Sequence, residues 1–435
     1  MPSSSFILAI ALVFVWIPIH YIAKVLLRPS FSQLQHLPGP KPAFFHTLVG
    51  EFLGVGLLFS VGDQHKRLRR IVSGPLSRPS IRKLFPTFST FSQRLNRDID
   101  EAIKESKGES IEIEHLFFRV ALDIIGSSLL GKEMRDFRSP SSPLSFEQCY
   151  HAILTQPLAG QVISFINPFV PLRWLPVSAN LNFLRAKTAL RNMMTELIEE
   201  RTSEVEKEGA ISDDLLTRMI EASSLENQKL SKEELIDITM QVITAGHDTT
   251  ASALSWTTYA LAKDLNVQDR LRNEILGLEA NAISAKSIDE LPYLDNVIRE
   301  AIRVYSPTLI VPWEALEDIV IAGVKIPKGT TVQLVPAMTQ LNPEIWGADA
   351  EVFNPDRWDN LSGDAASPYA MESFSNGPRM CPGKALALLE IKTLLVGLIR
   401  EFRLEMADDQ GLELRNPSLV LKSKNPSRFK VTRVE

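Results

Sequence analysis

The strongest constraint on the fold of this chain is one long segment, residues 231–263, that contains no proline. Ser231 and Glu234 at its start match the capping-box pattern, in which two side chains satisfy free backbone N–H groups at a helix N-terminus. At a rise of 1.5 Å per residue, the predicted helix is roughly 50 Å long. A helix of this length crosses an entire domain, so we expect it to run through the centre of a helical fold.

The middle of this predicted helix carries a polar sequence where burial should be greatest. Residues 244–250 read Thr-Ala-Gly-His-Asp-Thr-Thr. Glycine and β-branched residues weaken a helix interior, and hydroxyl side chains can bond back to the preceding turn and bend the helix. Two interpretations remain open on this segment alone: a bent core helix with satisfied hydroxyls, or a groove that serves a function.

Most of the remaining sequence also favours helices, and a smaller part favours strands. Helical patterns cover residues 82–278, 293–304 and 384–401. Short strands joined by Gly and Pro turns are expected within residues 317–335, 402–406 and 427–431. The sequence therefore predicts a mainly α fold with a small β part.

Composition excludes several classes of protein. The chain has 435 residues, 45% of them apolar, and a formal net charge of −5, which excludes disorder over most of its length. Cys149 and Cys381 are the only cysteines, too few for a disulfide framework or for a zinc or iron–sulfur site built from cysteine pairs. The mild acidity argues against nucleic acid as the main partner, and the only dense basic run is residues 65–70.

An uncharged apolar run near the N-terminus predicts a membrane anchor. Residues 6–23 carry no charged side chain and approach the roughly 20 apolar residues that span a bilayer as a helix. Lys24 and Arg28 follow the run and no basic residue precedes it, which favours an uncleaved anchor with the rest of the chain in the cytosol. A core helix is the alternative, which the proline-rich spacer at residues 37–42 disfavours.

A single cysteine stands just before the predicted helix at residues 384–401. The helix N-terminus and its backbone N–H groups should lower the pKa of the Cys381 thiol, while Arg379 adds a positive charge and Gly377 permits an unusual φ. One thiolate without a partner cysteine suits the proximal ligand of a haem iron, with Arg379 pairing a propionate. A catalytic cysteine nucleophile and a buried inert cysteine remain as alternatives.

These segments resemble the signature motifs of the cytochrome P450 family, the haem-thiolate monooxygenases. The cysteine signature Phe-x-x-Gly-x-Arg-x-Cys-x-Gly is matched by Phe374, Gly377, Arg379, Cys381 and Gly383. The distal helix motif is matched by Ala245, Gly246, Asp248, Thr249 and Thr250. Glu300 and Arg303 match Glu-x-x-Arg, and residues 353–358 resemble the motif that supplies a further arginine, Arg357. The resemblance covers residues 62–434.

The resemblance implies a role for each matched residue. Cys381 would be the axial metal ligand of haem b, with Arg379, His65 and Arg69 at its propionates. Thr249 would face the iron–oxygen species and Asp248 would deliver protons, across a groove opened at Ala245 and Gly246. Glu300, Arg303 and Arg357 would form a structural triad beneath the cysteine loop. His247 is expected to be a packing residue, because the helix turns it about 100° from either neighbour.

The resemblance also implies the activity. A membrane-anchored eukaryotic monooxygenase, of filamentous-fungal secondary-metabolism type, would insert one oxygen atom of O2 into an apolar small molecule such as a terpenoid, a polyketide or a fatty compound. Electrons would come from NADPH through a separate flavoprotein reductase at the endoplasmic reticulum membrane, docking on the basic run. Residues 308–312 and 241–245 are expected to line the pocket. Two alternatives are a haem-thiolate isomerase or dehydratase, and a truncated, haem-poor and non-catalytic family member.

We divide the chain into an anchor (1–28), a proline-rich spacer with a shortened N-terminal region (29–61) and a haem-binding catalytic domain (62–435).

The chain departs from the family pattern at two places. Relatives usually place several tens more residues before the position of Gly62, so an exon-skipped gene model or a natural deletion is inferred, either of which exposes a sheet edge. Trp313 stands where many relatives carry an arginine for a propionate.

Overall fold

The computed structural model describes residues 50–434 apart from 141, 168–170, 209–212, 225–228, 280–281, 409–412 and 415–419. The predicted anchor at residues 1–28 and the spacer that follows it lie outside the described residues. Within the described part, none of the helices combines the length and the apolar character needed to cross a bilayer.

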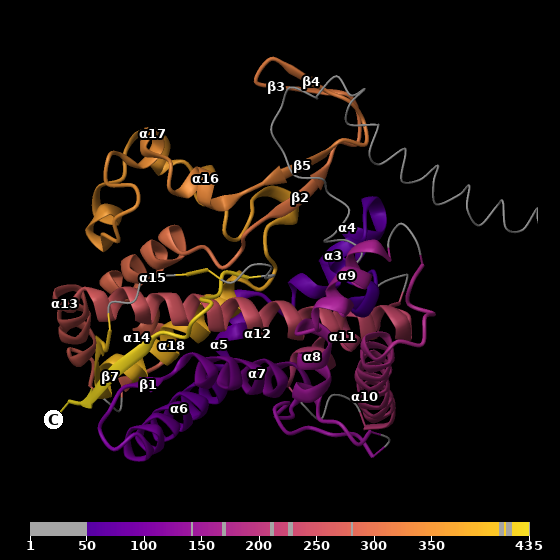
Figure 1. Cartoon of the computed structure of the whole chain (residues 1–435), viewed down its shortest axis with the longest axis horizontal. Helices are drawn as coiled ribbons and strands as arrows, with labels where there is room; N and C mark the ends of the chain where they lie inside the picture. Colours follow the sequence, from indigo (N-terminus) through magenta and orange to yellow (C-terminus); the bar gives the residue numbers. More distant parts are fainter. Residues whose placement is uncertain are drawn as a thin grey trace, which may run out of the picture.

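One helix, α12 (Lys232–Lys263), runs through the middle of the molecule (Figure 1). Ser231 is its N-cap, and the Ser231 hydroxyl and the Glu234 carboxylate complete the predicted capping box. The helix packs against α7 (Glu114–Leu130), α10 (Ser178–Glu208), α15 (Pro292–Val304) and α18 (Lys384–Glu401). The predicted central position of the long helix is confirmed.

Further helices surround α12. Those before it are α3 (Gly56–Phe59), α4 (Gly62–Ser73), α5 (Arg78–Arg82), α6 (Phe85–Glu105), α8 (Phe146–Leu154), α9 (Leu158–Ile166) and α11 (Leu215–Ser224). Those after it are α13 (Leu265–Leu276), α14 (Ala285–Asp289), α16 (Pro336–Gln340) and α17 (Pro343–Trp346), with 3-10 turns that include η3 (Pro355–Asn360) and η6 (Gly377–Arg379). The predicted helix at residues 384–401 has the bounds of α18.

The strands form three small antiparallel sheets. β1 (Ile111–Glu112) pairs with β7 (Arg428–Arg433), which pairs with β6 (Phe402–Met406). β3 (Ile319–Ile321) and β4 (Val324–Ile326) form a hairpin, and β2 (Val311–Glu314) pairs with β5 (Thr331–Leu334). The predicted mainly α fold with a small β part is confirmed, although the sequence pattern predicted neither β1 nor β2.

The core follows from apolar residues at helical spacing. In α6, Phe88, Phe91, Leu95 and Ile99 recur every three or four residues and are all buried, so one face of that helix packs against α7 and α18. The same pattern in α15 buries Leu294, Val297, Ile298 and Ala301. This packing fixes α15 and α18 beside α12, which brings together the segments that carry the sequence motifs.

The segment before α4 is fastened to α12 by side chains of that helix. The backbone N–H of Val55 donates to Asp237 (3.0 Å) and that of Leu58 to Gln241 (2.8 Å), while Gln241 donates to the Val55 carbonyl (2.9 Å). We expected Gln241 to line the pocket. Its side-chain amide instead bonds to the backbone of Val55 and Leu58. Residues 50–60 therefore form a cover over the first half of α12.

Candidate active site

The cysteine loop is held by its own backbone. The N–H of Cys381 donates to the carbonyl of Phe374 (2.8 Å), closing the loop around η6. Gly377 has φ +66°, a left-handed conformation that L side chains rarely adopt, which accounts for the glycine in the motif. A Cβ added at Gly383 would lie 3.9 Å from the Cys381 sulfur, so this glycine borders the sulfur itself. α18 starts directly after Gly383.

The expected low pKa of Cys381 is wrong for the protein chain by itself. Burial raises the pKa of the Cys381 thiol, and the N–H groups of Gly383 and Lys384 and the charges of Arg69 and Lys384 lower it only in part. The helix N-terminus acts in the predicted direction, but desolvation of the anion is the larger effect. A bound metal ion deprotonates a coordinating thiol outright, so a metal partner would favour the thiolate form of Cys381.

Three basic side chains gather beside the sulfur. Burial and the charges of Arg379 and Arg69 lower the pKa of His65, and burial and Arg69 lower the pKa of Arg379. Burial also lowers the pKa of Arg69, against the attraction of Cys381. Arg379 donates to the carbonyl of Ser60 (2.7 Å). Within the described residues, Arg69 has no hydrogen bond or ion pair with a carboxylate, so this cluster lacks an anion.

The middle of α12 is open on one face. Ala245 is exposed and Gly246 and Thr249 are half-buried, in a stretch where His247, Asp248 and Thr250 are buried. The Thr249 hydroxyl donates to the Ala245 carbonyl (2.5 Å), which is the predicted bond back to the preceding turn. A Cβ added at Gly246 would come within 3.1 Å of Ile125, so this glycine lets α7 pack closely against α12.

Asp248 and His247 lie on the buried side of the same turn. Asp248 accepts hydrogen bonds from the Tyr150 hydroxyl (2.8 Å) and from Lys422 (3.2 Å). His247 Nδ1 lies 3.9 Å from Asp248 Oδ1, and its ring makes edge contacts with Phe118 and Tyr150. His247 therefore packs between aromatic rings.

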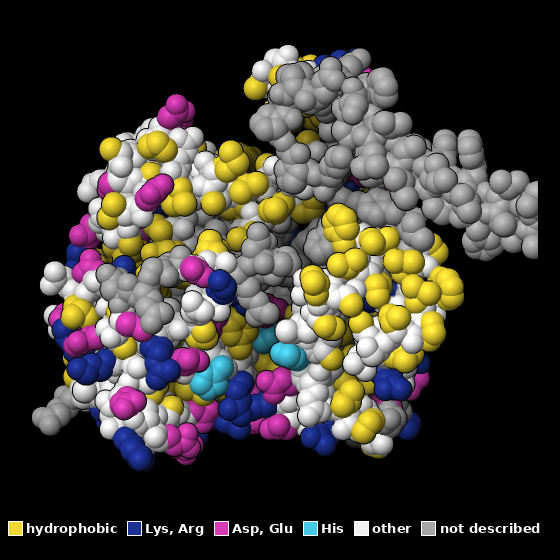
Figure 2. Space-filling view, in the orientation of Figure 1, with side chains coloured by type: hydrophobic (Ala, Val, Ile, Leu, Met, Phe, Trp, Pro, Cys, Tyr) yellow, Lys and Arg dark blue, Asp and Glu magenta, His cyan; other side chains and the backbone are white. Residues whose placement is uncertain are grey.

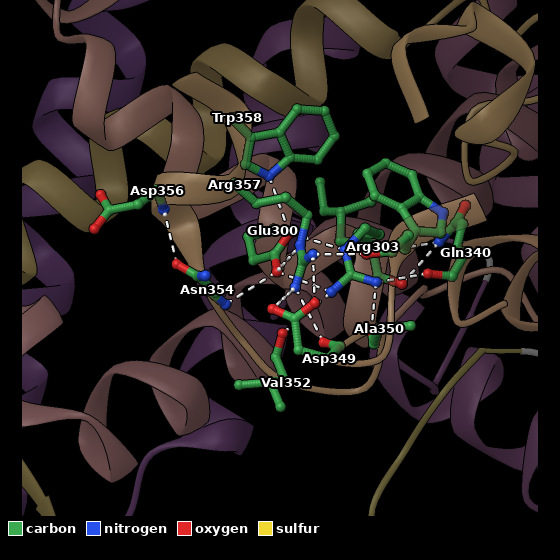
Figure 3. A network of polar contacts seen from close by, with 12 residues as sticks. Glu300, Arg303, Gln340, Asp349, Ala350, Val352, Asn354, Asp356, Arg357 and Trp358 are labelled. Carbon is green, nitrogen blue, oxygen red and sulfur yellow. Dashed lines mark hydrogen bonds and ion pairs between the residues drawn. The ribbon is translucent and has the colours of Figure 1, made fainter. Parts of the chain in front are cut away.

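Glu300, Arg303 and Arg357 meet in one buried cluster (Figure 3). Two parallel bonds of 2.8 Å join the Arg303 guanidinium to the Glu300 carboxylate, and both side chains are fully buried. Arg357 donates to the same carboxylate (3.3 Å), as do the backbone N–H of Asn354 and the indole of Trp358 (both 3.0 Å). Glu300 thus has five donors, which is the complete hydrogen bonding that a buried charge needs.

A buried glutamine connects this cluster to the cysteine loop. Arg303 donates to the Gln340 carbonyl (2.6 Å), and the Gln340 amide donates to the carbonyls of Ile302 and Arg303 (3.1 and 3.0 Å). Its oxygen accepts from the backbone N–H of Glu372 (2.9 Å) and the hydroxyl of Ser373 (2.8 Å). Ser373 immediately precedes Phe374, so the triad fixes the residue at which the cysteine loop begins.

The family profile described as Cytochrome P450 matches residues 22–431. This chain belongs to the cytochrome P450 family. Cytochrome P450 monooxygenase sphH from Aspergillus fumigatus is 31% identical, with 87% of this chain and 73% of that protein covered. Cytochrome P450 monooxygenase 205 from Postia placenta is 30% identical, with 84% and 74% covered. The chain is therefore an oxidoreductase of the monooxygenase type.

A crystal structure of the cytochrome P450DA heme domain has the same fold. Its TM-score is 0.75 at 24% identity, with 91% of this chain and 84% of that structure covered. Membership of the cytochrome P450 family implies a haem-thiolate cofactor. The residues present fit that group: the Cys381 thiol at the start of α18, basic side chains beside it without a carboxylate partner among the described residues, and a helix whose middle is open at Ala245.

Sequence reasoning did not find the partners of the motif residues. Tyr150 and Lys422, which bind Asp248, lie 98 and 174 positions away from it along the chain. Gln340 lies 37 positions from Arg303 and outside every motif. No local signal marks such residues. Trp358, which donates to Glu300, belongs to the motif at residues 353–358, and its position beside Arg357 indicated that it could lie near the triad.

We expect Glu300→Gln to destabilise this cytochrome P450 by about 3–5 kcal/mol, because it removes the carboxylate that both buried guanidiniums share. Asp349→Asn is the matched control, since it also binds Arg357 (2.8 Å) but is half exposed, and should cost less than about 1 kcal/mol. Denaturant unfolding followed by circular dichroism measures both. Equal losses in the two variants would contradict the central role of Glu300.

Arg69→Gln should weaken haem retention roughly 10–100-fold, the effect of losing one hydrogen bond to a charged group. Arg70→Gln, the exposed neighbour on α4, is the control and should leave retention unchanged. The measurement is the rate of haem transfer to excess apomyoglobin. A wild-type transfer rate in Arg69→Gln would show that this side chain does not bind the cofactor.

Proposed function

We propose that this protein inserts one oxygen atom of O2 into an apolar small molecule, using electrons that a separate NADPH-dependent flavoprotein reductase supplies. The observation that carries the proposal is the cysteine loop: Cys381 lies at the start of α18 beside the basic cluster of His65, Arg69 and Arg379. A thiol next to the guanidiniums of Arg69 and Arg379, which have no carboxylate partner in the described part of the chain, suits a metal cofactor with acidic side groups.

In this proposal the Cys381 sulfur would hold haem b, and His65, Arg69 and Arg379 would bind its propionates. Bound haem supplies the activation of O2 and the transfer of one oxygen atom. Phe374, Gly377 and Gly383 shape the loop: the Phe374 carbonyl accepts from Cys381, Gly377 takes the left-handed turn, and Gly383 leaves room at the sulfur. Glu300, Arg303 and Arg357 hold the loop in place through Gln340.

The proposed oxygen side of the site is the open face of α12. The small side chain of the exposed Ala245 leaves room at this face, and Thr249, one turn along the helix, is bonded to the Ala245 carbonyl. Asp248 is the proposed source of protons, since oxygen transfer from O2 requires two of them. The cover of residues 50–60, which is bonded to α12, is proposed to exclude water.

The proposed substrate is apolar, and residues 308–312 are the proposed pocket lining. They are half-buried or exposed, with Ile310 42% exposed, while Thr308 is anchored to the Ser373 carbonyl (3.3 Å) beside the cysteine loop. Terpenoids, polyketides and fatty compounds fit an apolar lining of this kind. The fungal origin of the two relatives named above supports a role in fungal secondary metabolism.

We place the protein at the endoplasmic reticulum membrane. Large exposed apolar side chains gather over α3, α9 and the start of α10, on the face that Figure 2 shows. The members of this apolar face are Val55, Leu58, Leu158, Val162, Phe165, Trp174, Val177 and Leu181. An apolar face of this extent suits contact with lipid.

The reductase is proposed to dock on exposed members of the basic run. Lys66 and Arg70 are exposed on α4, where a negatively charged partner can approach them. Arg67 does not belong to this docking surface, because it forms an ion pair with Glu234 of α12 in which both side chains are largely buried.

The test is oxygen labelling with purified reductase, NADPH and a panel of medium-chain fatty acids and terpenoids under 18O2. We expect one labelled oxygen atom per product molecule. Thr249→Ala should lower product per NADPH by roughly tenfold or more and raise hydrogen peroxide, since positioned proton transfer contributes about 10²–10⁴-fold.

Thr257→Ala is the matched control, because Thr257 makes the same bond back to the Ala253 carbonyl (2.7 Å) elsewhere on α12. It should behave as wild type. Product that forms at an undiminished rate without O2, in wild type and in Thr249→Ala alike, would replace the proposal with a haem-thiolate isomerase or dehydratase.

A further inference from the structure

Asp248 is bound by side chains from two other parts of the chain. The Tyr150 hydroxyl, from α8, donates to Oδ2 (2.8 Å), and the Lys422 ammonium, from the segment before β7, donates to Oδ1 (3.2 Å). Asp248 is 5% exposed and Tyr150 6%. Each carboxylate oxygen thus has its own donor, and one of the two donors carries a full positive charge.

Aromatic rings keep this arrangement in place. The Lys422 ammonium lies 4.1 Å from the centre of the Phe118 ring, a cation–π contact that replaces part of its hydration. His247 fits between Phe118 and Tyr150 with ring centres 5.7 and 5.4 Å away, and Tyr150 stacks on Phe146. These contacts join α7, α8, α12 and the C-terminal segment around one carboxylate.

The charges around Asp248 favour its ionised form. Burial raises the pKa of Asp248, but His247, Lys422 and the Tyr150 hydroxyl together hold it below its ordinary value. Burial, together with Asp248, raises the pKa of Tyr150 well above its ordinary value, and burial lowers the pKa of His247. Lys422, Tyr150 and His247 are the titratable side chains that face Asp248 in the described part of the chain.

The acid and the neighbouring alcohol are not joined in this conformation. The Thr249 hydroxyl donates to Ala245, and both oxygens of Asp248 are turned toward Tyr150 and Lys422. Asp248 can pass on a proton only after it takes one up from water, and the carboxylate that then remains is stabilised by Tyr150 and Lys422. They therefore determine how strong an acid Asp248 is, without contacting the reacting atoms.

We propose that Tyr150 and Lys422 are positioning residues that set the acid strength of Asp248 and thereby its supply of protons to the Thr249 side of α12. This inference rests on the proposed monooxygenase function. Three observations support it: the hydrogen bonds from Tyr150 and Lys422 to Asp248, the burial of the carboxylate, and the cation–π contact of Lys422 with Phe118. It assigns a role in the reaction to α8 and to the C-terminal segment.

The experiment titrates the carboxylic-acid infrared band of Asp248 in the haem-loaded protein, with Asp248→Asn used to assign the band. Lys422→Met should move the titration to higher pH, because the carboxylate loses its cation, and Tyr150→Phe should do so to a smaller extent. Lys422→Arg, which keeps the charge, should restore the wild-type titration.

Lys424→Met is the matched control, since Lys424 pairs with Glu413 at the surface (2.7 Å) two residues along the chain. It should leave the band unchanged. In parallel, Lys422→Met should increase the share of NADPH electrons that end as hydrogen peroxide several-fold, while Lys424→Met should not. A band that Lys422→Met and Tyr150→Phe both leave at the wild-type position overturns the proposal.

Stability gives a second readout that needs no turnover. A carboxylate with a lowered pKa stabilises the fold above its unfolded-state pKa, and this stabilisation is lost as the pH falls through its folded-state pKa. In Lys422→Met the loss should begin at higher pH than in wild type or Lys424→Met. If Lys422→Met folds poorly, Tyr150→Phe is the variant to measure, because it removes a single hydroxyl.

A wild-type protein without a haem-thiolate spectrum would contradict the proposed function and not only the role of Tyr150 and Lys422, so the two failures are distinguishable.

Discussion

The buried ion cluster around Glu300 is the interaction on which the geometry of the site depends. Arg303 has no access to water and satisfies its guanidinium with Glu300 and the carbonyls of Gln340, Ala350 and Val352. The bonds to Ala350 and Val352 fix backbone that lies outside any helix or strand, and the bond to Gln340 fixes the end of α16. Replacing such a cluster by apolar groups is often neutral for stability, so its effect here is to specify one loop conformation.

The ion cluster acts on the cysteine loop through the hydrogen bonds of Gln340 to Arg303 and Ser373. At the sulfur itself, burial is a second constraint. The chain surrounds Cys381 with N–H donors and cations, yet burial still raises the pKa of the thiol. The protein thus supplies a shaped and positively charged position, and a bound metal would add the charge that favours the thiolate. Arg69 likewise has no carboxylate partner among the described residues, so its positive charge suits an acidic cofactor.

The sequence predicted those features that depend on local pattern. The capping box at Ser231 and Glu234, the bounds of α18 and the strand at residues 402–406 follow from short-range chemistry, and the structure confirms them. What escaped prediction depends on contacts between distant parts of the chain. Nothing near Gln241 indicates that residues 54–58 bind it, and no pattern links Asp248 to Tyr150 or Lys422. The thiol pKa failed for a related reason: burial at Cys381 is set by packing of the whole fold.

The most direct test of this account is the absorption spectrum of the reduced, carbon monoxide-bound protein, wild type beside Cys381→Ser. If the sulfur of residue 381 is the axial ligand, the wild type shows the red-shifted band of a thiolate-ligated haem and the serine variant loses it. An unaltered red-shifted band in Cys381→Ser would contradict the account.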